Sequence, residues 1–195
     1  MAIYTRVNSV IPIKAEEGLS GLLQPKPPLS DSERVSNRGL YPTSLVDGLD
    51  SQLNLPELDS EGRALMIDLG LFVLINVYCP NDGAGTEERD KFKMDYHRLL
   101  ELRVRRLLEE GREVMVLGDI NACAAVIDHC EGPLMVARGQ TMGMKDEEGF
   151  WGTGCRRWLR EWLAREDSEG TVHGGPMVDI VRRFWPDRKG MYTCE

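Results

Sequence analysis

The sequence has no long apolar run and no basic segment leading into one at its start. The longest apolar stretch, Leu65–Val77, is interrupted by Asp68 and Asn76, whereas a helix that crosses a bilayer needs about 20 mostly apolar residues. The opening residues, Met-Ala-Ile-Tyr-Thr-Arg, lack the basic and then hydrophobic pattern of a secretory signal. We therefore expect no membrane partner.

The cysteines are not spaced for metal binding. The five cysteines are odd in number and none belongs to a Cys-x-x-Cys pair, which argues against a disulfide scaffold and a structural zinc site. We expect reduced thiols in a reducing compartment for all of them, namely Cys79, Cys123, Cys130, Cys155 and Cys194.

Positive charge is also in deficit, because 24 Lys and Arg residues stand against 32 Asp and Glu residues, a net charge of −8. Nucleic-acid-binding proteins usually have a basic surface, so this balance argues mildly against such a partner. The basic residues are nevertheless grouped. Each group is either a solvated face or a contact for phosphates, and both interpretations stay open for 103–106, 156–160 and 182–189.

Strand and helix patterns alternate along most of the chain, which indicates a layered α/β class. The chain of 195 residues is long enough for one domain with its own core. From about residue 16 to 60, several prolines and leucines without a period predict a flexible insertion. The predicted strands are 2–7, 63–69, 71–78 and 114–117, and the predicted helices are 90–109, 150–165 and 178–184.

A pair of polar residues follows the apolar run Val114–Leu117, which we interpret as a strand buried on both faces. Gly118 ends the run, and Asp119 and Asn121 come next. In an extended backbone, side chains two residues apart point the same way. A carboxylate beside a carboxamide suits a proton acceptor and an oxygen site for a hard cation such as Mg²⁺. The alternative is a turn that favours Gly, Asp and Asn for its own geometry.

A second polar group ends the neighbouring apolar run. Tyr78 closes the run, Pro80 turns the chain and Asn81 follows. A phenol and a carboxamide can both donate hydrogen bonds to a phosphate oxygen, although a tyrosine whose ring caps the core is the simpler interpretation. If both strands run in the same direction, Tyr78, Asp119 and Asn121 meet at one sheet edge, where ligand sites of α/β folds are common.

Three segments resemble the exonuclease III type of AP endonuclease, which belongs to the endonuclease/exonuclease/phosphatase superfamily. They are Ile-Asn-Val-Tyr-Cys-Pro-Asn (75–81), Leu-Gly-Asp-Ile-Asn (117–121) and Ala-Val-Ile-Asp-His (125–129). Ala-Ile-Tyr-Thr-Arg near the start and residues 178–186 extend the likeness, which is closest to the fungal AP endonuclease 2 branch. The resemblance implies an incomplete four-layered α/β sandwich, in which residues 1–195 form part of a nuclease domain.

For the matching residues, the resemblance implies roles around a scissile phosphate. Tyr78 and Asn81 would bind or polarise the phosphate, so that Asn81 contacts DNA. Asp119 would position or deprotonate the attacking water. Asn121 would orient that water or share a metal site with Asp119.

The resemblance also implies a reaction and a substrate. Asp128 would support the site, and Arg182 or a neighbour would contact the DNA backbone. The reaction would be hydrolysis of the phosphodiester 5′ to an abasic site in double-stranded DNA, assisted by Mg²⁺ or Mn²⁺. A 3′ exonuclease activity on blocked 3′ ends would accompany it, in the nucleus.

Some family motifs are not found in the sequence. An Asn-x-Asp motif and a Gln-Glu-Thr segment would lie upstream of Met1, and a Ser-Asp-His segment downstream of residues 192–193. None of His97, His129 and His173 matches the missing histidine. We therefore expect a fragment with little or no nuclease activity. Two alternatives are an RNA or nucleotide phosphodiesterase of the same superfamily and a non-catalytic fragment or pseudoenzyme.

Overall fold

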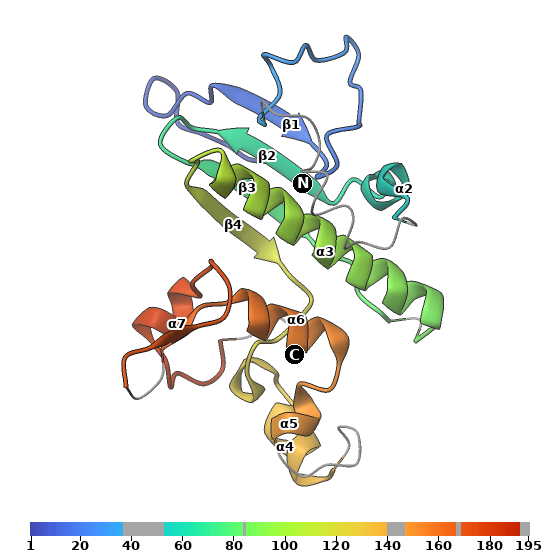
Figure 1. The fold of residues 1–195 in the computed structure, drawn as a ribbon, viewed down its shortest axis with the longest axis vertical. Helices are drawn as coiled ribbons and strands as arrows, with labels where there is room; N and C mark the ends of the chain where they lie inside the picture. The colour runs from blue at the N-terminus through green and yellow to red at the C-terminus, as the bar shows by residue number, and fades with distance from the viewer. Residues whose placement is uncertain (37–52, 84, 140–146, 167–168, 192–195) are drawn as a thin grey trace. The chain divides into compact units, whose positions relative to one another are not determined.

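A four-stranded sheet in the order β1-β2-β3-β4 carries the first part of the chain (Figure 1). Its strands are β1 Lys14–Glu17, β2 Ala64–Asp68, β3 Val73–Tyr78 and β4 Val114–Asp119. The computed structural model describes residues 1–36, 53–83, 85–139, 147–166 and 169–191. The chain divides into two compact units, Met1–Asn121 and Ala122–Glu195, and each is described by itself.

The β2–β3 hairpin confirms the predicted strands 63–69 and 71–78, which join at Gly70. The two strands are antiparallel, with Met66 opposite Ile75, and Gly70 takes a φ of 84° that favours glycine. β3 and β4 are parallel, because the long helix α3, Glu87–Glu109, connects them in the manner of a crossover connection.

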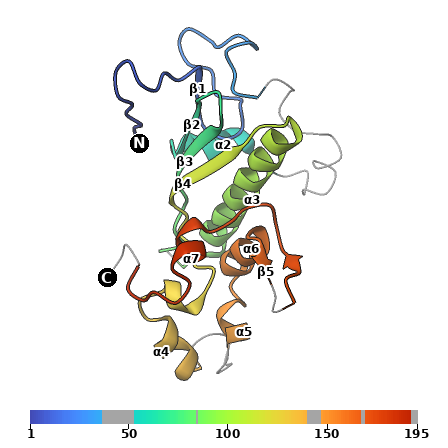
Figure 2. The same cartoon turned by 90° about the vertical axis from the view of Figure 1, so that its left-hand side faces the viewer.

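Helix α3 begins three residues before the predicted range 90–109 and ends where the sequence predicts, at Glu109. The side chain of Thr86 caps it by accepting a hydrogen bond from the Arg89 amide at 3.2 Å, and Gly111 follows its last turn with a φ of 74°. The helix covers one face of the sheet (Figures 1 and 2). The fully buried residues shared by helix and sheet include Val73, Ile75, Val77, Leu99, Leu100, Val104 and Leu107.

The expectation that β4 is buried on both faces is wrong. β4 is the last strand of the sheet within the described residues, and α3 covers only the face that carries Val114 and Val116. Met115 and Leu117 point to the other face and are 46% and 47% exposed. The apolar run therefore identified a strand correctly but did not reveal how many layers cover it.

The range predicted as a flexible insertion, 16–60, contains secondary structure and buried backbone at both ends. Glu16 and Glu17 belong to β1, and α2, Leu55–Ser60, closes the range. Only its middle, 37–52, lies outside the described residues. The lack of a helical or strand period hid this structure, because polar contacts rather than a periodic apolar face hold it.

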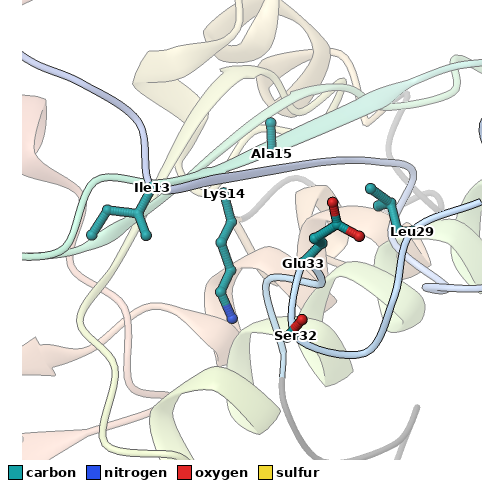
Figure 3. Close-up of a pocket in the computed structure, with 6 residues that line it drawn as sticks. All are labelled: Ile13, Lys14, Ala15, Leu29, Ser32 and Glu33. Atoms are coloured by element: carbon teal, nitrogen blue, oxygen red, sulfur yellow. The ribbon is translucent and has the colours of Figure 1, made fainter.

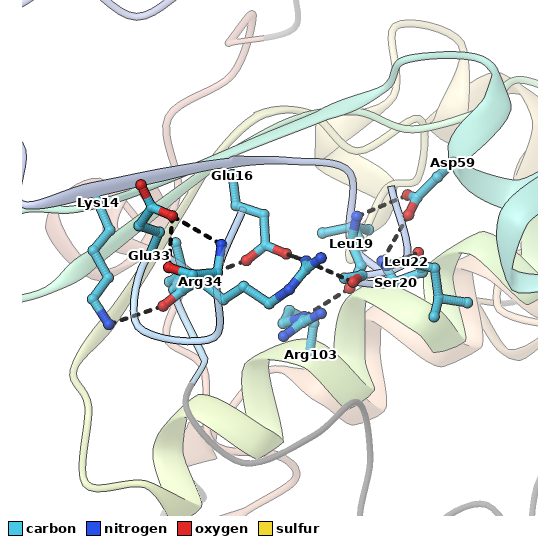
Figure 4. A network of polar contacts seen from close by, with 12 residues as sticks. Lys14, Glu16, Leu19, Ser20, Leu22, Glu33, Arg34, Asp59 and Arg103 are labelled. Carbon is cyan, nitrogen blue, oxygen red and sulfur yellow. Dashed lines mark hydrogen bonds and ion pairs between the residues drawn. The ribbon is translucent and has the colours of Figure 1, made fainter. Parts of the chain in front are cut away.

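Asp59 lies at one end of this network of polar contacts and holds the turn that begins at Gly18 (Figure 4). Its carboxylate accepts hydrogen bonds from the buried amides of Leu19 at 2.7 Å and Ser20 at 2.8 Å. A β-carbon on Gly18 would lie 2.6 Å from the same carboxylate, so the close approach requires glycine. Arg103 of α3 donates to the Leu19 carbonyl at 2.7 Å, which ties this loop to the core helix.

Two further predictions about elements need correction. Residues 2–7 form no strand, since alternation alone supplies no pairing partner. The predicted helix 150–165 is split into α5, Glu147–Phe150, and α6, Gly154–Trp162, with a turn at Trp151. In α6, Trp158 and Trp162 stack with ring centroids 5.0 Å apart.

The remaining elements of the second unit are short. They are a 3-10 helix Val126–Asp128, α4 Gly132–Ala137, β5 Arg165–Glu166, β6 Val172–His173 and α7 Ile180–Phe184. The last of these confirms a helix before Pro186. The four described cysteines form no disulfide, while Cys194 lies outside the described residues. Among the described helices, none has the length and apolar character to cross a bilayer.

Candidate active site at the ends of β3 and β4

Tyr78 and Asp119 lie side by side at the ends of two parallel strands. They are register partners, and the Cys79 amide donates to the Asp119 carbonyl at 2.8 Å. Partners in a parallel ladder present their side chains on the same face. Tyr78 is 46% exposed, so its ring does not serve as a buried cap of the core. The predicted meeting of the two strand ends is therefore present.

Asn121 reaches the same place by a different route from the one predicted. The strand ends at Asp119, and Asn121 takes a left-handed φ of 51°, so the two-residue alternation of a strand does not apply. Its backbone amide donates to Asp119 Oδ1 at 2.9 Å, and its Nδ2 donates to the Cys79 carbonyl at 2.6 Å. The turn interpretation is confirmed, and the turn orients the carboxamide; the role of Asp119 and Asn121 in a site stays a prediction.

Two residues of the first unit support this turn. Gly118 has a φ of 120°, and a β-carbon there would lie 1.9 Å from the Val77 carbonyl oxygen, so no other residue fits. Buried His97 on α3 bonds through Nε2 to the Ile120 carbonyl at 2.9 Å. Burial lowers the pKa of His97 to about 4, so at neutral pH the ring is uncharged and donates from Nε2 to that carbonyl. Sequence reasoning excluded His97 as a catalytic residue but missed this supporting contact.

Asn81 lies in an exposed loop just beyond Tyr78. Its Oδ1 accepts from the Gly83 amide at 3.5 Å, and its backbone carbonyl accepts from Arg89 Nε at 3.0 Å. Arg63 stands over the Tyr78 ring, 5.1 Å from the centroid. Neither arginine was predicted for the site, although Arg63 directly precedes β2 and its carbonyl accepts a hydrogen bond from the Tyr78 amide at 2.9 Å.

Asp128 and Arg182 contact each other in the second unit. Arg182 Nε donates to Asp128 Oδ1 at 2.7 Å, and the Ala125 amide donates to Asp128 Oδ2 at 2.9 Å. Arg182 also donates to the Arg188 carbonyl at 2.7 Å. This guanidinium holds the 3-10 helix against the chain that follows α7, whereas its neighbour Arg183 has a side chain that is 70% exposed. The structure therefore gives Arg182 a structural contact and leaves Arg183 facing solvent.

The residues at the strand ends offer few ligands for a metal ion. Asp119 supplies a carboxylate. The Asn121 side chain supplies Oδ1 as a second acceptor, because its hydrogen bond to the Cys79 carbonyl uses Nδ2. Within the described ranges, no three His, Cys, Asp or Glu residues gather closely enough to hold an ion. Mg²⁺ is commonly bound by one or two carboxylates together with substrate phosphates and water. The two residues fit such a shared site and do not fit a closed protein cage.

A shallow pocket lies at the other edge of the sheet from β4 (Figure 3). It is lined by Ile13, Lys14, Ala15, Leu29, Ser32 and Glu33. Lys14 Nζ donates to the Arg34 carbonyl at 2.9 Å, so its charge is already engaged. The pocket contains none of the residues predicted for the site.

Comparison with solved structures identifies the class of protein. The fold matches the crystal structure of the Xenopus laevis APE2 catalytic domain with a TM-score of 0.65 and 27% identity, over 95% of this chain and 52% of that chain. The chain therefore has the mixed α/β fold of the endonuclease/exonuclease/phosphatase type.

Comparison with curated sequences narrows the class. The chain is 36% identical over 196 residues to the DNA-(apurinic or apyrimidinic site) endonuclease 2 of Bos taurus, covering 96% of this chain and 34% of that protein. It is 29% identical over 199 residues to the protein of the same name in Schizosaccharomyces pombe, covering 100% and 34%. No protein-family model matches.

The chain is thus a homologue of the AP endonuclease 2 proteins, and it spans about a third of the length of these curated relatives. The resemblance to the exonuclease III type of AP endonuclease is confirmed. The two identities do not favour the fungal relative over the mammalian one.

Proposed function

We propose that this chain contributes the phosphate-facing strand ends of a Mg²⁺-dependent phosphodiesterase that cleaves DNA 5′ to abasic sites. The single observation that carries the proposal is the pairing of Tyr78 with Asp119 at the ends of β3 and β4. Both side chains are exposed at one edge, and Asn121 is held beside them through Cys79. The AP endonuclease names of the relatives support DNA as the substrate.

Each residue has a role that follows from its contacts. Asp119 accepts a proton from the attacking water or holds it by a hydrogen bond. Tyr78 and Asn81 donate to the non-bridging phosphate oxygens, where negative charge grows in the transition state. The turn at Asn121 fixes the direction of the Asp119 carboxylate, because the Asn121 amide occupies one of its oxygens.

A divalent cation, Mg²⁺ or Mn²⁺, belongs to this proposal. It would be held by Asp119 and Asn121 together with the substrate phosphate, and it would supply Lewis-acid stabilisation of the phosphate charge. Because only two protein ligands are available among the described residues, we expect the chain to need millimolar Mg²⁺ and to show little incision. A companion 3′ exonuclease activity and a nuclear location are further parts of the proposal.

Incision of a duplex that contains an abasic-site analogue tests the proposal. We expect slow cleavage that rises with Mg²⁺, is lost about 10²–10⁴-fold in Asp119→Asn, and falls about 100-fold in Tyr78→Phe. Asp31→Asn, an equal change at an exposed residue, is the control and should leave the rate unchanged. Cleavage that ignores Asp119, or equal cleavage of RNA and abasic DNA, would refute the assignment.

The small number of ligands favours one alternative, a non-catalytic DNA-binding chain. In that case the abasic duplex binds but is not cut at any Mg²⁺ concentration, and Asp119→Asn leaves binding unchanged. A tagged chain that is excluded from the nucleus would refute the proposed location.

A further inference from the structure

One carboxylate joins two arginines beside the candidate site. Glu61 receives Arg89 as a fork, with Arg89 Nη1 at 2.7 Å from Oε1 and Nη2 at 3.2 Å from Oε2. Arg63 Nε binds Glu61 Oε2 as well. These hydrogen bonds, that of Arg89 first, lower the pKa of Glu61, so the carboxylate is charged at neutral pH and serves both arginines.

Each arginine also donates one hydrogen bond to the backbone of the loop that carries the phosphate-facing residues. Arg63 Nη1 donates to the Tyr78 carbonyl at 3.0 Å, and its guanidinium stands over the Tyr78 ring. Arg89 Nε donates to the Asn81 carbonyl at 3.0 Å. The two ends of the segment Tyr78–Asn81 are therefore held by two arginines that share one partner.

An ordinary surface ion pair would contribute little to stability. The contacts of Glu61 differ from such a pair because they join several elements of the fold. Glu61 follows α2, Arg63 precedes β2, and Arg89 lies in the first turn of α3, so three separate elements converge. Pro80 has no amide with which to hold the loop. Cys79, between the two ends, binds the Asp119 carbonyl through its amide, and the arginine contacts to the Tyr78 and Asn81 carbonyls hold the segment on either side of it.

We propose that Glu61 is a positioning residue of the candidate active site: through Arg63 and Arg89 it sets the Tyr78–Asn81 segment so that phenol and carboxamide face the same phosphate. The inference rests on the proposed function for its purpose. The structural part of the inference, that the Glu61 carboxylate holds both ends of the segment, can be tested without any cleavage reaction. Glu61, Arg63 and Arg89 touch no reacting atom in this scheme.

The test compares Glu61→Gln with Glu101→Gln in the whole chain. The control removes the carboxylate that pairs with Arg105 on α3, at 2.7 Å, and leaves the loop alone. Amide hydrogen exchange by NMR should be about tenfold faster in Glu61→Gln at Cys79, whose amide binds the Asp119 carbonyl, and at Gly83, whose amide binds Asn81 Oδ1, and unchanged in the control. The ring resonances of Tyr78 should shift as the guanidinium leaves its face, a signature that general destabilisation does not produce.

Single arginine variants separate the two ends of the segment. Arg89→Lys keeps a charge for Glu61 but loses the second donor, so exchange should rise only at Gly83, whose amide binds the Asn81 side chain. Arg63→Lys should move the Tyr78 ring signal only. Glu61→Asp, which keeps the carboxylate, should restore part of the wild-type exchange.

The outcomes distinguish the positioning role of Glu61 from the proposed function. Wild-type exchange and an unshifted Tyr78 signal in Glu61→Gln would overturn the positioning role, whatever the incision assay shows. Faster exchange in Glu101→Gln of the same size would also overturn it. If the wild-type chain neither binds nor cuts abasic DNA while the loop loosens as expected, the proposed function fails and the control of the segment by Glu61 stands.

Discussion

Acidification from pH 7 to pH 5 should destabilise the first unit through a single buried imidazole. His97 is fully buried on α3, and burial lowers its pKa to about 4, while an unfolded histidine titrates near about 6.5. Between pH 6.5 and pH 4, His97 is therefore protonated in the unfolded chain but mostly neutral in the folded chain. Stability is complete above about pH 6.5 and falls as the pH drops toward 4. The loss is about 2 kcal/mol at pH 5 and about 3 kcal/mol at pH 4.

Urea unfolding between pH 7 and pH 4.5 measures this loss. His97→Gln removes the imidazole, so the variant should be less stable at pH 7 and should lose only the His129 share of stability between pH 6.5 and 5. Burial also lowers the pKa of His129 in the second unit, and His129→Gln is the matched control that isolates its share. A wild-type stability that is flat across this range, or an equal loss in His97→Gln, would refute the argument.

Three further predictions concern single contacts. Gly118→Ala places a β-carbon 1.9 Å from the Val77 carbonyl oxygen and should cost at least about 2 kcal/mol, seen as a lower Tm. Asp59→Ala leaves two buried amides unpaired and should cost about 2–5 kcal/mol in urea unfolding, with Asp59→Asn intermediate. Asp128→Asn weakens the pair with Arg182 and should lower stability by about 1–2 kcal/mol without changing the salt dependence of duplex binding; a changed dependence would make Arg182 a DNA contact.

Local patterns predicted the elements that rest on local causes. The hairpin at Gly70 and the helix between Thr86 and Gly111 follow from turn chemistry, capping and a helical period, and the structure confirms them. The meeting of Tyr78 with Asp119 was also predictable, since the helix between their strands makes the two strands parallel.

The rest depends on contacts between distant residues. The order around Asp59 joins residues 40 positions apart, and no window of sequence shows it. The left-handed turn at Asn121 replaced an expected extended backbone, because Gly118 and Asp119 set a turn before alternation can continue. Glu61 and Arg89 are 28 positions apart, so the sequence gives no sign that these two charged residues contact each other.

Among the residues that the structure describes, no strand pairs with the outer edge of β4, and this has a consequence for how the protein behaves as its concentration rises. An unpaired strand edge is a template for another strand, and beside it Met115 and Leu117 offer apolar surface. Asp119 is the last residue of that same strand, so a second copy that pairs there would stand next to the carboxylate. Self-association would then hide the candidate site, and DNA binding per molecule should fall as the protein is concentrated, the reverse of an enzyme that dimerisation activates.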